Sequence, residues 1–245
     1  MQHSRATKPR VIILAGYGLN CEDETAFAFE TAGAKAEIAH INDLKKIDSY
    51  QILVVPGGFS FGDDTGSGKA YAHKLKAKLG DQLQEFLTRD TLMIGICNGF
   101  QILTSAGILP GALTHNDSQR YISKWVEVRA EGNSPWLMPS RTPSALPLQL
   151  KGELERVSLP IAHGEGKYII DPKQPPTIAF RYVENPNGST DDIAGILGYD
   201  GRVLGMMPHP ERAQFEWQRP PGLSAQGGSA TGGQIFRNAV DYFNI

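Results

Sequence analysis

The feature of this sequence that most constrains its fold is an apolar run that ends at a cysteine between two glycines. Residues 91–96 are rich in apolar side chains, Cys97 follows, and a second apolar run begins after Gly99. Because Gly95 and Gly99 let the backbone double back, the pattern predicts a buried strand, a sharp turn and a helix. The turn would present the Cys97 sulfur in the open at the end of a sheet, where the helix N-terminus favours a thiolate. A buried structural cysteine is the alternative reading of these residues alone.

Comparable apolar runs recur through the first half of the chain, separated by loops and helical patterns. Asn20 is the expected N-cap of the first helix, because the acidic residues after it suit the positive end of a helix. This strand–helix alternation predicts a parallel sheet covered by helices on both faces. Strands are expected at residues 11–15, 35–41, 51–56 and 91–96, and helices at residues 20–31, 70–89 and 99–106.

The sequence pattern changes in the second half of the chain. The Asp-Gly dipeptide at 200–201 favours a two-residue hairpin turn. The stretch 131–150 is dense in Pro and Ser and is expected to form a surface excursion or a partner-facing loop, and the stretch 220–233 is expected to be flexible. We expect one domain over residues 11–245, after a polar tail at residues 1–10. Further strands are expected at residues 123–129, 156–161, 167–170, 177–183, 193–199 and 202–207, and a terminal helix at residues 234–243.

Composition and charge exclude several classes of function. The 24 basic and 26 acidic residues nearly cancel, so no overall field recruits nucleic acid or an anionic membrane. The apolar stretches are too short to span a bilayer, and residues 1–10 lack the apolar segment of a secretory signal. Two cysteines do not form a disulfide framework, and no residues have the spacing of a metal site. A cytoplasmic protein with free thiols is therefore expected.

A histidine and a carboxylate near the end of the chain could serve Cys97. A cysteine nucleophile needs a base, and the base needs an acceptor that orients it. His209 stands at the end of a predicted strand, and Pro210 biases its backbone towards extended geometry. Residues two apart in an extended segment point the same way, so His209 and Glu211 would project together. The sequence therefore predicts a catalytic triad of Cys97, His209 and Glu211.

Two consecutive glycines offer backbone donors at the same end of the predicted sheet. Gly57 and Gly58 directly follow the strand 51–56, and ligands of open α/β sheets bind where such strands end. The backbone N–H groups of Gly57 or Gly58, together with that of Asn98, could form an oxyanion hole for the chemistry of Cys97. A Gly-Gly pair after a strand is otherwise a common turn. The glycines match neither dinucleotide-binding nor phosphate-loop spacing.

Several motifs carry a resemblance to a known family. The segments around Cys97 and His209, with residues 56–58 upstream, resemble those of class I glutamine amidotransferases. Longer motifs narrow the resemblance to the glutaminase subunits of phosphoribosylformylglycinamidine synthase, and the match runs over residues 11–243. These longer motifs lie at residues 58–63, 162–166, 186–189, 206–212 and 235–238.

The resemblance implies a fold and a mechanism. The fold would be an α/β, flavodoxin-like three-layer sandwich with a mostly parallel central sheet. Cys97 would attack the side-chain amide of L-glutamine, and His209, held by Glu211, would move the proton that lets ammonia leave. Water would then release glutamate from the thioester. By analogy with the family, the substrate would be held by Phe59, Gln101, His163, Gly164 and Glu165.

The resemblance also implies partners. Ammonia would pass to a separate synthetase subunit, which uses ATP and Mg²⁺ to convert formylglycinamide ribonucleotide to its amidine in de novo purine biosynthesis. A small accessory subunit would join this complex. No cofactor and no metal are expected in this chain itself, and neither a nucleic acid nor a membrane is expected as a partner.

Three alternatives stay open on the residues alone. A peptidase or another hydrolase with a cysteine elbow would need neither Gln101 nor the pair of His209 and Glu211. A non-catalytic docking subunit would not need all three triad candidates together. An amidotransferase subunit of another pathway, such as histidine, pyridoxal phosphate or folate biosynthesis, is excluded only by the resemblance of the longer motifs. Cys21, at the start of the first predicted helix, has no assigned chemistry.

Overall fold

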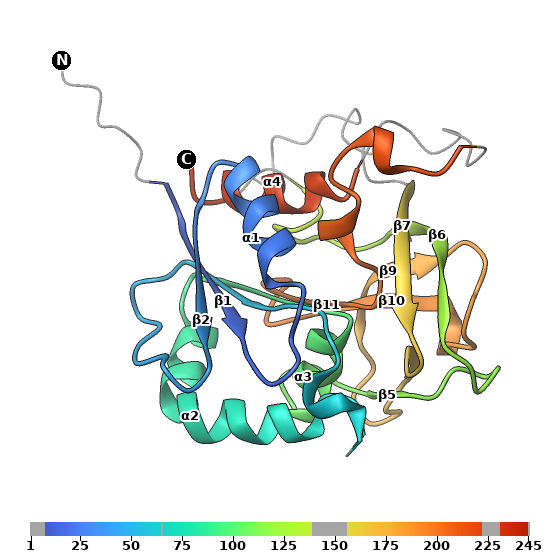
Figure 1. Cartoon of the computed structure of the whole chain (residues 1–245), viewed down its shortest axis with the longest axis horizontal. Helices are drawn as coiled ribbons and strands as arrows, with labels where there is room; N and C mark the ends of the chain where they lie inside the picture. Colours follow the sequence, from blue (N-terminus) through green and yellow to red (C-terminus); the bar gives the residue numbers. More distant parts are fainter. Residues whose placement is uncertain (1–7, 65, 139–155, 222–230, 245) are drawn as a thin grey trace.

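The central sheet combines a parallel core with an antiparallel extension. The computed structural model describes residues 8–64, 66–138, 156–221 and 231–244. Over these residues a nine-stranded sheet has the order β2-β1-β3-β4-β11-β10-β9-β6-β7 (Figure 1). The parallel core consists of β2 (Lys35–His40), β1 (Arg10–Ala15), β3 (Ile52–Val55), β4 (Leu92–Ile96) and β11 (Val203–Met206). The antiparallel extension consists of β10 (Ile193–Gly198), β9 (Thr177–Tyr182), β6 (Ile122–Ala130) and β7 (Arg156–His163).

Helices cover both faces of the parallel core. On one face α1 (Glu22–Thr31) contacts α4 (Gly233–Asp241), and on the other α2 (Lys69–Thr88) contacts α3 (Asn98–Ser105) (Figure 1). The resulting three layers confirm the predicted α/β fold with a mostly parallel core. Each expected strand and helix of the first half is present within one or two residues of its predicted bounds.

The shorter elements depart from the expectations. The strand β5 (Ala112–Thr114) was not predicted, and it pairs with β8 (Lys167–Ile169) in a second, two-stranded sheet. The hairpin of β10 and β11 is antiparallel as predicted, but its turn spans residues 199–202 instead of two residues. Three of these turn residues have positive φ, which lengthens the turn beyond the expected type. Short 3-10 helices are η1 (Ser60–Asp63), η3 (Thr190–Asp192), η4 (Pro210–Arg212) and η5 (Glu216–Gln218).

The first helix begins one residue later than predicted. Cys21, not Asn20, is the N-cap of α1, and no side chain caps the helix there. The Thr25 N–H and hydroxyl both donate to the Cys21 carbonyl, at 3.2 and 2.5 Å. The acidic side chains of the first turn still suit the positive helix end, as expected. This shift places the Cys21 side chain at the carboxyl end of the parallel core.

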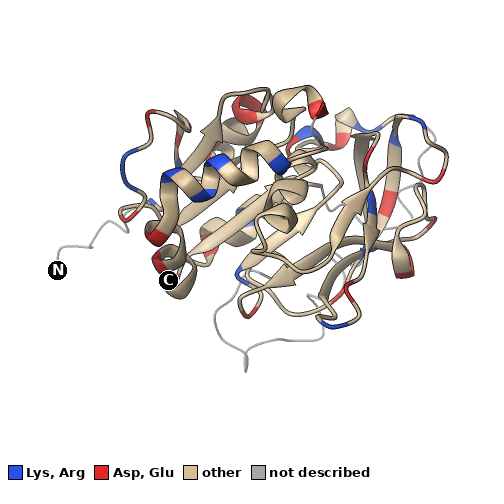
Figure 2. Ribbon diagram, turned by 90° about the horizontal axis from the view of Figure 1, so that it is seen from below, with Lys and Arg blue, Asp and Glu red and all other residues tan. Residues whose placement is uncertain are grey.

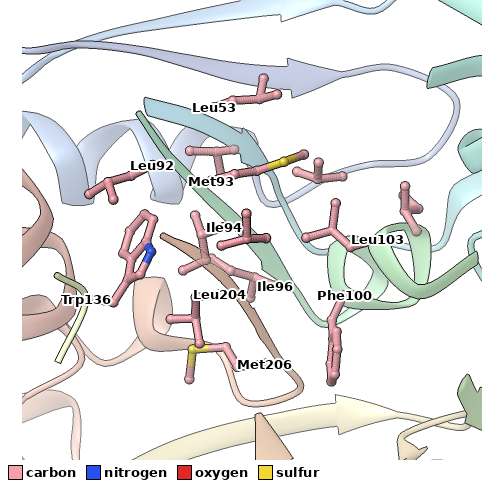
Figure 3. Packing of buried hydrophobic residues seen from close by; sticks show 14 of the residues in the cluster. Leu53, Leu92, Met93, Ile94, Ile96, Phe100, Leu103, Trp136, Leu204 and Met206 are labelled. Carbon is pink, nitrogen blue, oxygen red and sulfur yellow. The ribbon is translucent and has the colours of Figure 1, made fainter. Parts of the chain in front are cut away.

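The core is densest where the central strands meet α3. All residues of β3 and β4 are buried, and Figure 3 shows Ile94 and Ile96 packed with Leu204 and Met206 of β11. Each fully buried side chain of this size contributes about 1.5–3 kcal/mol to folding. Phe100 of α3 lies in the same cluster, so the core fixes the ends of β4 and β11 and the start of α3.

One part of the expected surface excursion lies in the core instead. Trp136 is fully buried, its Nε1 donates to the Arg202 carbonyl at 3.1 Å, and its own carbonyl accepts from Asn238 Nδ2 at 3.1 Å. A large aromatic side chain with its N–H satisfied is stable inside, whatever the composition around it. Residues 139–150 of the excursion, and residues 222–230 of the stretch expected to be flexible, lie outside the described residues.

Figure 2 shows basic and acidic residues on several of the described elements. Within the described residues, no helix has both the length and the apolar character needed to cross a lipid bilayer.

Candidate active site

The turn between β4 and α3 consists of Cys97 alone. Its backbone is strained for a non-glycine residue, with φ 50° and ψ −105°. A Cβ on Gly99 would lie 1.8 Å from the Val55 carbonyl oxygen, and one on Gly95 would lie 2.7 Å from the Gly99 oxygen. Gly99 therefore lies so close to β3, and Gly95 so close to α3, that glycine is required at both positions, as the sequence predicts.

The Cys97 sulfur is more enclosed than expected. Cys97 is only 4% exposed, so the expectation of a sulfur in the open is wrong. The reason is that β7 of the antiparallel extension lies against the turn, with the Ala162 carbonyl oxygen 3.7 Å from Sγ. The sequence predicted the parallel core, but it did not predict that β7 would lie over the Cys97 sulfur.

His209 and Glu211 form a buried pair just beyond β11. His209 Nδ1 and Glu211 Oε1 are 2.6 Å apart, and both residues are 2% exposed. The sequence predicted the two side chains together, but through an extended segment. Instead, Pro210 begins η4, and the tight turn brings the carboxylate back to the ring. Because Nδ1 faces a carboxylate it carries a proton, which leaves Nε2 for other groups.

The electrostatics of the pair favour an imidazolium. Burial opposes the charge on His209, but the Glu211 carboxylate and the sulfur atoms of Cys97 and Cys21 raise its pKa well above the ordinary value. Nε2 has no hydrogen-bond partner among the described residues. The structure therefore brings Cys97, His209 and Glu211 together, and an imidazolium there would stabilise a thiolate.

A second thiol lies beside the same ring, and sequence reasoning missed its surroundings. Cys21 is 0% exposed, and Arg212 Nη2 donates to its sulfur at 2.8 Å. The position of Cys21 in the sequence could have indicated this, because Cys21 lies in the loop after β1. The carboxyl ends of neighbouring parallel strands lie at one edge of the sheet, so this loop is expected near the proposed active site. The sequence separation of 191 residues between Cys21 and Arg212 hides the contact itself.

The cluster around Cys21 contains atoms of metal-ligand type. The Cys21 sulfur, a His209 ring nitrogen and a Glu211 carboxylate oxygen lie within 4.8 Å of one another. The guanidinium of Arg212, in contact with that sulfur, would repel a cation at this place. We therefore interpret the cluster as a hydrogen-bonded network.

The oxyanion-hole candidates adjoin the same ring. A Cβ on Gly57 would lie 2.7 Å from His209 Cε1, and the Gly57 carbonyl accepts the N–H groups of Asn20 and Cys21 at 3.1 and 3.2 Å. Gly58 has φ 154°, and a Cβ there would lie 2.4 Å from the Gly18 carbonyl oxygen. The loop after β3 is thus fixed against the loop after β1 and against His209.

The third oxyanion candidate and two predicted substrate residues form one hydrogen-bonded chain. Asn98 Oδ1 accepts the Ser60 N–H at 3.0 Å, and Asn98 Nδ2 donates to Gln101 Oε1 at 2.7 Å. Gln101 Nε2 in turn donates to the Glu165 carbonyl at 2.6 Å. The Asn98 side chain is therefore engaged in this chain, and its backbone N–H, at the start of α3, remains the group suited to an oxyanion.

His163 is a neutral imidazole next to the pair. Asn116 Nδ2 donates to the carbonyls of His163 and Arg120, each at 2.9 Å, so Asn116 Oδ1 faces His163 Nδ1 at 3.1 Å. Nδ1 therefore carries the ring proton, and Nε2 is an acceptor. Burial, followed by the charge of His209, lowers the pKa of His163 to about 4. The Gly164 carbonyl accepts the Asn116 N–H at 3.0 Å.

The remaining substrate candidate lies nearer the surface. Phe59 is 42% exposed, and its ring centroid is 6.1 Å from that of Tyr121. A cavity of about 370 Å³ lies beside Gln101 and Glu165, and Lys69 also lines it. Phe59 thus lies at an exposed aromatic contact, whereas Gln101 and Glu165 line a polar cavity.

Comparisons with known proteins extend over nearly the whole chain. The family model of the CobB/CobQ-like glutamine amidotransferase domain matches residues 8–243. Phosphoribosylformylglycinamidine synthase subunit PurQ from Methanococcus maripaludis is 39% identical, over 96% of this chain and 98% of its own. The PurQ subunit from Pyrobaculum aerophilum is 45% identical, over 83% of this chain and 88% of its own.

Solved structures agree with these relatives. A chain in the structure of PurLQS from Thermotoga maritima has a TM-score of 0.79 and 33% identity, covering 96% of this chain and 99% of that chain. A glutamine amidotransferase from the same organism, at 16% identity and a TM-score of 0.54, covers 83% of this chain and 76% of that chain and shares its fold. The chain therefore belongs to the CobB/CobQ-like glutamine amidotransferase family, and within it to the PurQ subunits of phosphoribosylformylglycinamidine synthase.

Proposed function

We infer that this chain is the glutaminase subunit of phosphoribosylformylglycinamidine synthase and hydrolyses L-glutamine to glutamate and ammonia through Cys97, His209 and Glu211. The observation that carries this proposal is the buried 2.6 Å pair of His209 and Glu211, which leaves a ring nitrogen free beside a cysteine on a strained turn. Cysteine hydrolases require a nucleophile, a base and an orienting acceptor, and this site supplies one of each.

The proposed reaction begins from a thiolate and an imidazolium. The Cys97 thiolate attacks the side-chain carbonyl carbon of glutamine, and the electron pair of the carbonyl moves to oxygen. His209 Nε2–H gives its proton to the amide nitrogen, the C–N bond breaks, and ammonia leaves a γ-glutamyl thioester. His209 then takes a proton from water as the water attacks the thioester. The C–S bond breaks, glutamate is released, and the thiolate and imidazolium are restored.

The backbone donors suit the negative charge that develops on the carbonyl oxygen. N–H groups of Gly57 or Gly58 and of Asn98 are the proposed oxyanion donors, because the loop after β3 and the start of α3 meet beside Cys97. Removing one such donor typically costs about 10²- to 10³-fold in kcat. Preorganised donors of this kind explain why the turn at Cys97 is held so tightly against Val55.

Cys97 is the proposed nucleophile even though Cys21 lies next to the same ring. Glu211 holds Nδ1 of His209, and Cys21 is fully buried with its sulfur on Arg212. A sulfur that attacks a substrate must lie on the Nε2 side, where the ring can deliver a proton to the leaving group. Cys97, on the strained turn at the end of β4, is the sulfur proposed to lie there.

The proposed substrate contacts place glutamine beside α3. Gln101, the backbone of residues 163–165 and Phe59 would hold it, as the resemblance to the family implies. The cavity next to Gln101 contains Lys69 and Glu165, whose opposite charges complement the α-carboxylate and α-ammonium groups of an amino acid. A free amino acid therefore suits this cavity better than a peptide, which lacks both charges at an internal residue.

Ammonia from this reaction passes to a synthetase subunit, which converts formylglycinamide ribonucleotide to formylglycinamidine ribonucleotide in purine biosynthesis. The PurLQS structure from Thermotoga maritima, which contains a chain 33% identical to this one, supports a complex with a synthetase and a small accessory subunit. ATP and Mg²⁺ are proposed to act in the synthetase and not in this chain. A cytoplasmic location agrees with that pathway.

Two rival functions receive less support. An amidotransferase subunit of another pathway would not share 36 to 45% identity with PurQ subunits of three different organisms. A cysteine-elbow hydrolase outside the amidotransferases would not need the bonded chain from Asn98 through Gln101 to Glu165.

The test uses the chain reconstituted with its synthetase and small subunits. We expect Cys97→Ser to lower glutamine-dependent formation of the amidine at least about 10³-fold. Ammonia-dependent formation should stay at the wild-type rate, which shows that the synthetase is active, and co-elution of the variant chain with the complex is the control for folding and assembly. The glutamine analogue 6-diazo-5-oxo-norleucine should label Cys97, located by mass spectrometry. Label on Cys21, or glutamine-dependent synthesis by the Cys97→Ser complex, would overturn the proposal.

A further inference from the structure

Arg212 forms three contacts behind the proposed triad. Its Nη2 donates to the Cys21 sulfur at 2.8 Å, and its Nε lies 3.5 Å from Glu24 Oε1 and 3.8 Å from Glu211 Oε1. One guanidinium therefore joins the turn that carries the triad acid to the N-terminus of α1. The mechanism above uses neither Arg212 nor Cys21.

The Cys21 sulfur lies beside the His209 ring. A Cβ on Gly57 would lie 2.7 Å from His209 Cε1 and 3.0 Å from the Cys21 sulfur, so the ring, the sulfur and the Gly57 backbone meet at one point. The sulfur also lies within 4.8 Å of a Glu211 carboxylate oxygen. Cys21 is fully buried, so it cannot touch a substrate and can act only through the ring and the carboxylate.

Arg212 also places a positive charge beside the buried carboxylate of Glu211. Glu211 Oε2 is buried and has no hydrogen-bond partner among the described residues. A buried carboxylate with one unsatisfied oxygen is costly, and a cation nearby offsets part of that cost. The imidazolium at His209 depends on this carboxylate being charged. Arg212 therefore acts on His209 through Glu211.

We propose that Cys21 and Arg212 are positioning residues for glutamine hydrolysis, and that together they hold the His209 ring so that Nε2 points to Cys97. This inference rests on the function proposed above. Cys21 limits the rotation of the ring, and Arg212 anchors both the Cys21 sulfur and the Glu211 carboxylate. A small misplacement of a catalytic group costs up to about 100-fold in rate.

The test compares four variants in the reconstituted complex: Cys21→Ala, Cys21→Ser, Arg212→Gln and Arg212→Lys. We expect Cys21→Ala and Arg212→Gln to lower kcat for glutamine hydrolysis about 10- to 100-fold, with KM for glutamine within about twofold. Cys21→Ser should recover most of the rate, because its hydroxyl still accepts from Arg212. The double variant should be no slower than the slower single variant, because both changes break one contact.

A pH profile separates positioning from a merely structural role. The groups that face His209 are Glu211, Cys97, Cys21 and His163, with Arg212 beyond Glu211. Because the Cys21 sulfur favours the charged ring, Cys21→Ala should move the alkaline limb of the kcat profile to lower pH. Co-elution of the variant chain with the complex, together with a wild-type circular dichroism spectrum, reports that the chain is folded and assembled.

The possible results separate a failure of the positioning role from a failure of the proposed glutaminase function. Variants at both positions with the wild-type kcat and pH profile would overturn the positioning role while leaving the glutaminase intact. A wild-type complex that cannot use glutamine would overturn the proposed function, and this inference with it. If Cys21→Ala does not fold, Arg212→Gln alone decides, because its side chain is partly exposed.

Discussion

Two cysteines occupy the same kind of position in this molecule, but the connections that carry them differ. Cys21 precedes α1 and Cys97 precedes α3, and each helix follows a strand of the parallel core. Residues 16–21 join β1 to α1, whereas Cys97 alone joins β4 to α3. The short connection forces Cys97 to φ 50°, whereas Cys21 keeps φ −105°.

The difference shows why a helix N-terminus alone does not define a nucleophile. Both sulfur atoms lie near a helix N-terminus and near His209, and both raise the pKa of that ring. The longer connection lets Cys21 turn inward onto Arg212, and burial raises the pKa of its thiol despite that contact. The one-residue turn instead fixes Cys97 at the end of β4, next to the ring of His209.

Glu211→Gln gives the largest expected effect, because both thiols depend on His209 and its carboxylate. The amide keeps the shape but not the charge, so kcat for glutamine hydrolysis should fall about 10²- to 10⁴-fold. Without the carboxylate the pKa of His209 falls, so the ring beside Cys97 carries a positive charge less often. Rates of iodoacetamide alkylation, followed peptide by peptide between pH 5 and 8, should fall for Cys97 and stay low for Cys21.

Stability against pH offers a control for the same variant. The folded pKa of His209 is raised above its unfolded value of about 6.5. The pair therefore stabilises the wild-type fold fully below that value, and the contribution is lost as pH rises through the folded pKa. Glu211→Gln should flatten this alkaline loss. If Cys97 alkylation and the stability profile both match wild type, the charge of Glu211 has no role.

Gly99→Ala tests how tightly the shorter connection is packed. Its Cβ would lie 1.8 Å from the Val55 carbonyl oxygen, so β3 or α3 must shift. We expect a loss of about 3 kcal/mol or more in the free energy of unfolding, measured by urea denaturation. Gly164→Ala is the matched control, because its Cβ would meet no atom within 4 Å, and its cost should stay below about 1 kcal/mol. Equal losses for the two variants would contradict the tight turn.

The sequence predicted the parallel core and the Cys97 turn because both depend on local pattern. An apolar run that stops at Gly-x-Cys-x-Gly determines a strand, a turn and a helix with little help from distant residues. His209 and Glu211 were paired correctly, although the extended geometry that argued for the pair was wrong. Pro210 was expected to keep the backbone extended, but it begins the 3-10 helix η4 instead.

The features that the sequence did not predict depend on distant contacts. The bond from Arg212 to Cys21 joins residues 191 positions apart, and nothing local to either residue indicates it. Trp136 is buried because Arg202 and Asn238 satisfy its polar atoms, although its neighbours in sequence are typical of a loop. The cover over Cys97 has the same origin, because β7 reaches the turn through the antiparallel half of the sheet.

The smallest expected effect is that of a substitution at Asp63. Its loop contacts the connection between β1 and α1, and its carboxylate lies near a residue that is bonded to α3. The Phe61 N–H bonds the Tyr17 carbonyl in the β1 connection at 2.7 Å, and Glu165, bonded to Gln101 of α3, acts on Asp63. Burial, followed by the charge of Glu165, raises the pKa of Asp63 to about 6. Ionised Asp63 therefore costs stability as pH rises from about 4 to 6, because the unfolded chain ionises more easily.

Asp63→Asn should remove that cost without straining the loop, because asparagine tolerates the positive φ of 58° at this position. The full shift would correspond to about 3 kcal/mol, but Asp63 is only half-buried, so solvent screening reduces the expected gain at pH 7 to about 1 kcal/mol. At pH 4 the variant and wild type should unfold at the same urea concentration. Asp81→Asn, on the exposed face of α2, is the control and should leave the stability unchanged at both pH 7 and pH 4. A gain that is equal at both pH values would mean that Asp63 acts through packing, and that the two connections are not coupled through its charge.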